Sequence, residues 1–158
     1  LCAVNLMKKG VCMKKFLGIL AVALGSMTSV FAGDVVTRDV SKLPAVALKA
    51  IQTNFPQTKI SYIKIDKELL KKDAYEAVLT DGTELEFDAN GKWTEVDCKK
   101  KVVPPAFIPA KIRMYMKTEF PNVKVTKIER DKRGYELELD NGLEAKFDWQ
   151  GNFLRLKD

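Results

Sequence analysis

The sequence contains no histidine among its 158 residues, and this absence excludes several kinds of active site. Without an imidazole there is no Ser-His-Asp or Cys-His pair to activate a nucleophile, and the commonest side-chain ligand of zinc and iron is missing. The nine glycines form no phosphate-binding loop. We therefore predict a protein that is not an enzyme, with no catalytic residue, no metal site and no cofactor.

A strong excess of charge of one sign is also missing once the first residues are set aside. The formal net charge is +6, but four of the 27 basic residues lie within the first 33 positions, which hold no acidic residue. The remainder has 23 basic against 21 acidic residues. A chain so nearly neutral gains little from displacing counterions on DNA or RNA, so we predict no nucleic-acid partner.

No apolar run is long enough to span a membrane, and the longest one fits a signal peptide instead. Met13-Lys14-Lys15 precedes an apolar stretch from Phe16 to Leu24, and small residues follow at Ala32 and Gly33. This order is typical of a secretory leader, and an uncleaved amphipathic anchor is the alternative. We expect translation to start at Met13 (or Met7), residues 1–33 to be the leader, and cleavage near Ala32 or Gly33.

Cysteine is scarce as well. Cleavage would remove two of the three cysteines and leave Cys98 alone in an oxidising compartment. A single thiol there is buried and inert, paired with a second chain, or reactive. Lysines at positions 99–101 could favour its thiolate, so Cys98 is a candidate redox thiol.

What the chain does have is an internal repeat. Residues 43–56 match residues 108–121, and both segments carry Pro-Ala near the start and Phe-Pro at the end. Residues 75–91 match residues 135–151 with eight of 17 aligned residues identical, where chance gives about one. We interpret this as a duplication with repeat 1 at 34–98, a linker at 99–105 and repeat 2 at 106–158.

Each repeat predicts one helix followed by four antiparallel strands. The helices are expected to end at Pro56 and Pro121. Asp81-Gly82 and Asn141-Gly142 each stand between alternating segments and are strong hairpin signals. The resulting fold is α+β: two tandem helix-plus-four-strand repeats form one antiparallel sheet, with both helices on one face and the other face open. Apolar residues at near-helical spacing are expected to face the sheet: Val46, Leu48, Ile51 and Phe55, then Ile112, Tyr115, Met116 and Phe120.

These motifs resemble a known family. Leu43-Pro44-Ala45, the Phe-Pro helix ends, the two hairpins, and the segments 93–98 and 134–139 are similar to the PepSY-like, β-lactamase-inhibitor-like family of exported bacterial proteins. The resemblance covers nearly all of the chain after the leader. It implies a fold like that of β-lactamase inhibitory protein and a periplasmic location. It implies no particular activity. The inhibitors with this fold are held together by disulfides, which a mature chain with a single cysteine cannot form.

Two surfaces are candidates for contact with a partner. On the fourth strand of each repeat an aromatic alternates with charge, giving a predicted partner surface that comprises Trp93, Glu95, Asp97, Phe153 and Arg155. Whether that face is open or covered by the helices stays undecided, because the preceding turn leaves the register unsettled. The second surface is the tip of a longer hairpin at 67–72, where Leu69 and Leu70 either project outward or fold back on the core.

The predicted function is therefore a non-catalytic exported binding module. Its partner would be another envelope protein or a peptide, recognised by the open sheet face or by the hairpin, with inhibition as one form of binding. The alternative is a periplasmic carrier of a small ligand or peptide. The sequence does not indicate an oligomeric state.

Overall fold

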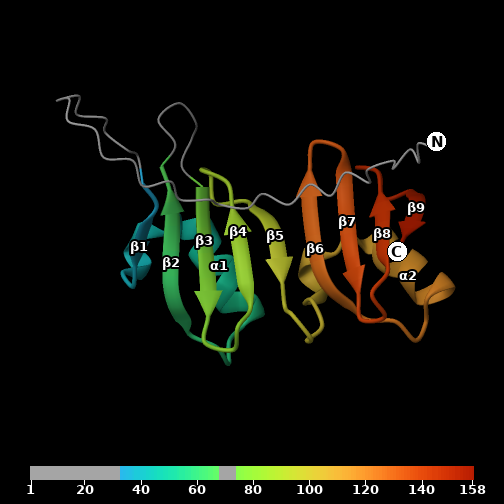
Figure 1. Ribbon diagram of the computed structural model, residues 1–158, viewed down its shortest axis with the longest axis horizontal. Coiled ribbons are helices and arrows are strands. Elements are labelled where there is room, and N and C mark those ends of the chain that lie inside the picture. Colours follow the sequence, from blue (N-terminus) through green and yellow to red (C-terminus); the bar gives the residue numbers. More distant parts are fainter. Residues whose placement is uncertain (1–32, 68–73) are drawn as a thin grey trace, which may run out of the picture. The chain divides into compact units, whose positions relative to one another are not determined.

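The computed structural model describes residues 33–67 and 74–158, and within them nine strands form one antiparallel sheet (Figure 1). The strands lie in chain order from β1 to β9, and every neighbouring pair is antiparallel. The strands are β1 Val35–Thr37, β2 Ile60–Asp66, β3 Ala74–Leu79, β4 Glu84–Phe87, β5 Trp93–Asp97, β6 Val125–Asp131, β7 Gly134–Leu139, β8 Glu144–Phe147 and β9 Phe153–Lys157.

The predicted α+β class and the single antiparallel sheet are confirmed. Each ten-residue helix, α1 Ala45–Asn54 and α2 Ala110–Glu119, is followed by four strands. Strand β1 was not predicted, because three residues are too short for a clear alternation. Short 3-10 helices at Val40–Lys42 and Pro105–Phe107 precede the two α-helices.

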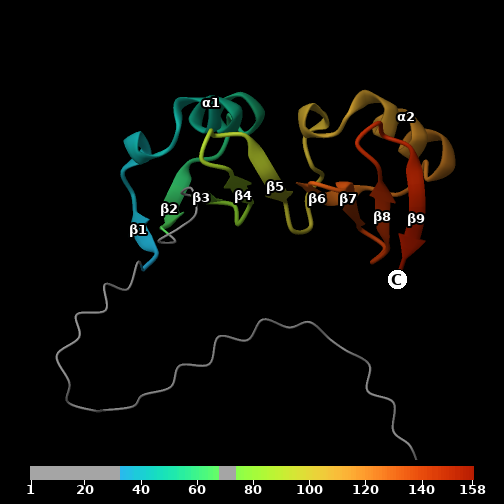
Figure 2. The same ribbon diagram turned by 90° about the horizontal axis from the view of Figure 1, so that it is seen from above.

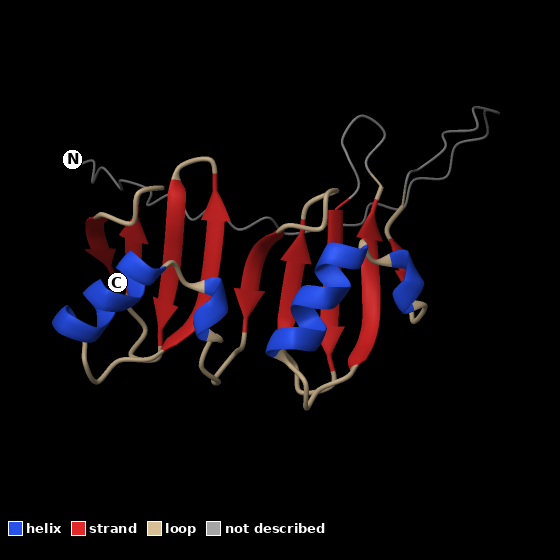
Figure 3. Ribbon diagram, turned by 180° about the vertical axis from the view of Figure 1, so that it is seen from behind, coloured by secondary structure: helices blue, strands red, loops and turns tan. Residues whose placement is uncertain are grey.

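Both helices lie on the same face of the sheet, as Figures 2 and 3 show. Ile51 of α1 and Ile112 of α2 belong to one buried cluster together with the strand residues that point toward the helices. The prediction for α1 is confirmed at Ile51 and Phe55 and wrong at Val46, which is 59% exposed while Ala47 is buried in its place. The opposite face of the sheet carries no helix in the described part of the chain.

Glycine is required where the turn between β4 and β5 passes under the start of α1. Gly91 has φ +75°, and a Cβ there would lie 2.7 Å from Cβ of Pro44. This close approach fixes the helix over the sheet, and it explains why the Asp-x-x-Gly turn ends in glycine. Gly151 occupies the matching turn with φ +76°, where the nearest atom to an added Cβ is Cβ of Lys111 at 3.3 Å.

Some predictions fall outside the described residues. The leader at 1–33 lies there except for Gly33, and so do Leu69 and Leu70. Neither described α-helix has the length and apolarity needed to cross a lipid bilayer.

Candidate binding surface on the open sheet face

The first half of the described chain ends with strands β4 and β5, and the second half ends with β8 and β9. A bulge in each of these strand pairs determines which side chains point toward the open face. Glu86 pairs with Glu95, but Phe87 pairs with Trp93, so Thr94 is an additional residue in β5. The same shift occurs between β8 and β9, where Leu154 is the additional residue. A bulge breaks the strict alternation of a strand, so an aromatic residue and a charge two positions apart no longer share a face.

The predicted shared face of aromatics and charges is therefore wrong. Trp93 packs against the helix-covered core, where its ring meets Phe107 edge-on at 5.7 Å between centroids. The guanidinium of Arg130 lies 4.4 Å from the centre of the Trp93 ring, and its Nε donates a hydrogen bond to the Trp93 carbonyl oxygen. Phe153 also packs on the helix-covered side, where its ring stacks on Tyr115 of α2 with 5.0 Å between centroids. Glu95, Asp97 and Arg155 remain on the open face.

The open face carries a continuous cross-strand row of charged residues, here named the glutamate row. Its members are successive pairing partners on eight neighbouring strands, and each except Arg155 is followed or preceded in sequence by a buried core residue. From β2 to β9 the glutamate row is Lys64, Glu76, Glu86, Glu95, Glu129, Glu136, Lys146 and Arg155.

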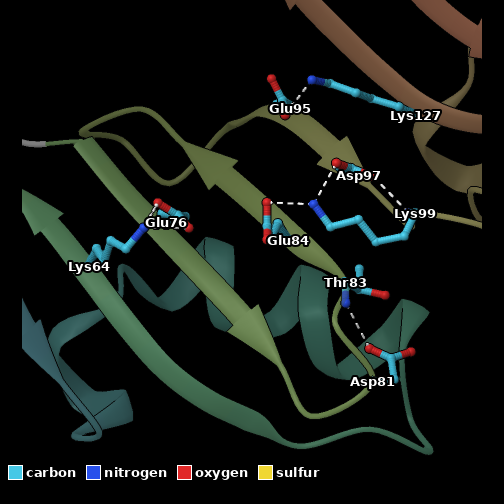
Figure 4. A network of polar contacts seen from close by, with 9 residues as sticks. All are labelled: Lys64, Glu76, Asp81, Thr83, Glu84, Glu95, Asp97, Lys99 and Lys127. Carbon is cyan, nitrogen blue, oxygen red and sulfur yellow. Dashed lines mark hydrogen bonds and ion pairs between the residues drawn. The ribbon is translucent and has the colours of Figure 1, made fainter. Parts of the chain in front are cut away.

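The basic residues of the glutamate row stand at its ends, so its centre is acidic. Lys64 Nζ lies 2.9 Å from an oxygen of Glu76, and Lys146 Nζ lies 2.6 Å from an oxygen of Glu136. Glu95 pairs at 2.8 Å with Lys127, which comes from the next row along the strands (Figure 4). Glu86 and Glu129, on either side of Glu95, form no ion pair within the described residues.

These two carboxylates have raised pKa values. For Glu86, nearby protein atoms displace part of the water around a side chain that is still exposed, and the charges of Glu95 and Glu76 raise the pKa further. For Glu129, partial burial and the charge of Glu95 act in the same direction. Like charges placed directly opposite each other on neighbouring strands destabilise a sheet, so the centre of the row favours an additional positive charge.

A second group of charges lies beside the row, around the end of β5. Lys99 bridges the carboxylates of Glu84 at 2.8 Å and Asp97 at 2.7 Å, as Figure 4 shows. Partial burial works against the charged amine, but its hydrogen bonds to Asp97 and Glu84 outweigh that effect and raise the pKa of Lys99. These acids are thus neutralised within the molecule, unlike Glu86 and Glu129.

The structure also has two hollows that occupy matching places in the two halves. One, of about 510 Å³, is lined among others by Lys64, Tyr75 and Glu76, and the other, of about 150 Å³, by Tyr135 and Glu136. Both open on the same face as the glutamate row. The additional residue of each bulge, Thr94 or Leu154, lines its hollow.

Cys98 has surroundings that oppose reactivity. The side chain is 3% exposed, and burial together with the charges of Asp81 and Asp97 raises the pKa of the thiol to about 11. The nearby lysines do not produce the thiolate that a redox role would require. The described residues contain no group of three or more acidic or cysteine side chains arranged to hold a metal ion.

Sequence reasoning identified Glu95 and Arg155 but missed the other members of the row. The row depends on which residues face each other across seven strand-to-strand pairings, four of which contain register shifts. The Tyr-Glu pairs at 75–76 and 135–136 could be recognised in the sequence as part of the repeat. That their glutamates belong to one charged row on the sheet follows only from the strand register.

Comparison with known proteins identifies the family. The family model described as "Putative beta-lactamase-inhibitor-like, PepSY-like" matches residues 73–155. None of the curated proteins is similar enough to match.

Three solved structures share the fold and much of the sequence. A "putative periplasmic protein of unknown function" from Bacteroides vulgatus is 54% identical over 80% of this chain and all of its own, with a TM-score of 0.76. A "putative calcium-regulated periplasmic protein" from Bacteroides thetaiotaomicron is 40% identical, and a second putative periplasmic protein from Bacteroides vulgatus is 41% identical. Each of these two covers 79% of this chain and 97% of its own, with a TM-score of 0.74. The chain therefore belongs to the PepSY-like, β-lactamase-inhibitor-like family.

Proposed function

We propose that this chain is an exported, non-catalytic binding module that docks a basic segment of another envelope protein on its open sheet face. The observation that carries the proposal is the glutamate row, whose central acids Glu86 and Glu129 are left without ion pairs in the described residues. A lysine or arginine placed between them would relieve repulsion that the fold itself leaves in place. The hollows on either side offer room for the flanking side chains of such a segment.

Several observations support the setting of this proposal. The solved relatives are described as periplasmic, which agrees with a leader at 1–33. The matching order of elements and the matching bulges agree with a duplication of one helix-plus-four-strand unit. The absence of histidine and the high pKa of Cys98 leave no activated nucleophile among the described residues.

A charge-reversal experiment tests the proposal. The double variant Glu86→Lys with Glu129→Lys is compared with Glu119→Lys, which changes an exposed residue on α2 at the other face. Each purified protein is used to capture partners from envelope extract at low and at high salt. We expect one enriched protein that is retained by Glu119→Lys, lost by the double variant, and released by salt.

Capture that is indifferent to the double variant would contradict this use of the open face. A synthetic peptide with the sequence of the captured segment should bind the unaltered protein and Glu119→Lys more tightly than it binds the double variant. Because one solved relative is described as calcium-regulated, the capture is repeated with added calcium and with a chelator.

A further inference from the structure

Strand β9 is an edge strand with a single neighbour in the described sheet. It pairs with β8, and the sheet ends there. Strand β5 stands at the same place in the first half but has neighbours on both sides, β4 and β6. An uncovered edge presents unpaired backbone N–H and C=O groups, which makes it a template for another strand.

The two strands have the same pattern with opposite charge. Residues 95–97 of β5 read Glu-Val-Asp, and residues 155–157 of β9 read Arg-Leu-Lys. The pairings confirm that these segments correspond, since Glu95 lies opposite Glu86 and Arg155 lies opposite Lys146, the matching residue of β8. In both strands the charged residues face the open side and the middle residue faces the helices.

Strand β6 shows what such a strand needs from its next neighbour. It places Ile128 opposite Val96, which becomes fully buried, and Lys127 forms an ion pair with Glu95 at 2.8 Å while lying opposite Asp97. An apolar side chain and a charge of opposite sign therefore cover the acidic pattern of β5.

Strand β9 lacks this cover. Leu156 is 39% exposed where Val96 is fully buried, and Met114, on the adjoining helix α2, is 72% exposed. Arg155 stands beside another cation, Lys146, and forms no ion pair with any described residue. Among the described residues Lys157 pairs with Glu144 alone, at 3.0 Å, and the lysine side chain is 55% exposed.

We infer that β9 is the docking edge for an extended acidic segment of a partner protein, which adds to the sheet as an antiparallel tenth strand. Its acidic residues lie toward Arg155 and Lys157 on the open side, and the apolar residue between them covers Leu156. Main-chain hydrogen bonds hold the segment, and the alternating side chains select it. A second copy of this chain does not have the required pattern on its described edges, because β1 reads Val-Val-Thr and β9 is itself basic.

This edge shares only Arg155 with the glutamate row and selects the opposite charge from the acidic centre of the row, so the two proposals fail separately. The probe is a nine-residue synthetic peptide in which glutamate alternates with leucine and valine, and its matched control carries lysine in place of glutamate. Binding is followed by the backbone amide signals of the isotope-labelled protein. We expect the glutamate peptide to shift the signals of residues 153–157 and to bind about tenfold more tightly than the lysine peptide.

Variants at exposed positions sharpen the test without threatening the fold. Arg155→Glu combined with Lys157→Glu should reverse the preference, so that the lysine peptide binds more tightly. Lys117→Glu, on the exposed last turn of α2, should leave it unchanged.

Three results would overturn the inference. One is a glutamate peptide that shifts signals of β1, or of the acidic centre of the glutamate row between Glu76 and Glu136, in place of β9. Another is equal binding of the two peptides. The third is self-association in sedimentation that the double variant abolishes, since a second copy would then occupy the edge.

Discussion

The last strands of the two halves, β5 and β9, show how far the surroundings of a strand determine the fate of its residues. Both begin with an aromatic residue, contain a bulge and then alternate charge with an apolar residue. Val96 of β5 is fully buried beside Ile128 of β6, whereas Leu156 of β9 is 39% exposed. Whether a residue of these strands is buried therefore depends on the presence of a neighbouring strand and not on the residue pattern within its own strand.

The halves also differ in where they place the lysine that pairs with the matching glutamates Glu76 and Glu136. In the first half the lysine is Lys64 on β2, and in the second half it is Lys146 on β8. Each glutamate thus keeps one ion pair, but the exchange moves both lysines away from the junction of the halves. The acidic centre of the glutamate row is a consequence of that exchange.

The largest difference between the halves is expected at the aromatic residues that open β5 and β9. Trp93→Ala removes the contacts with Phe107 and Arg130 that join the halves and should lower the free energy of unfolding by about 3 kcal/mol. Phe153→Ala, at the uncovered edge, should cost about 1 to 2 kcal/mol. Urea unfolding followed by circular dichroism measures both. Equal losses would show that the junction adds nothing to the packing of Trp93.

A smaller difference is expected at the two turn glycines. Alanine at Gly151 has to adopt a positive φ at a cost of about 1 kcal/mol. Alanine at Gly91 has the same φ and in addition meets Pro44, so Gly91→Ala should cost about 2 to 3 kcal/mol. Thermal unfolding of the two variants side by side gives the contribution of the contact with α1. A cost at Gly151 equal to that at Gly91 would mean that backbone conformation alone requires these glycines.

Most of the fold was predictable from the sequence because its signals are local. Pro56 and Pro121 lie just beyond the ends of the helices, and the Asp-Gly and Asn-Gly turns fix the pairing of the flanking strands. Strand β1 was not predictable, since its three residues become a strand only through pairing with β2.

The candidate site was predictable in part. Glu95, Asp97 and Arg155 do lie on the open face, but the aromatic residues beside them do not. The bulge that separates them leaves no clear mark in a five-residue strand. The glutamate row runs from Lys64 to Arg155, which are 91 positions apart, so it could be seen only after eight strands were set in register.

The smallest expected effect compares residues 86 and 146, which occupy the same place in the two halves with opposite charge. Glu86→Gln removes a charge from an acidic neighbourhood and should raise the free energy of unfolding at pH 7 by about 0.5 kcal/mol. Lys146→Gln removes the partner of Glu136 and should lower it by a similar amount, about 0.5 kcal/mol.

The sign of the pH dependence separates this explanation from a change in packing. Because the pKa of Glu86 is higher in the folded protein than in the unfolded chain, its charge destabilises the fold fully above the folded pKa. That penalty declines as the pH falls through the folded pKa, and it is gone below the unfolded pKa, where the side chain is neutral in both states. The gain in free energy of unfolding that Glu86→Gln gives over the unaltered protein should therefore shrink as the solution becomes acidic. Urea unfolding of both proteins at several pH values measures this difference. An advantage that stays constant into acid would mean that charge repulsion in the glutamate row is not its source.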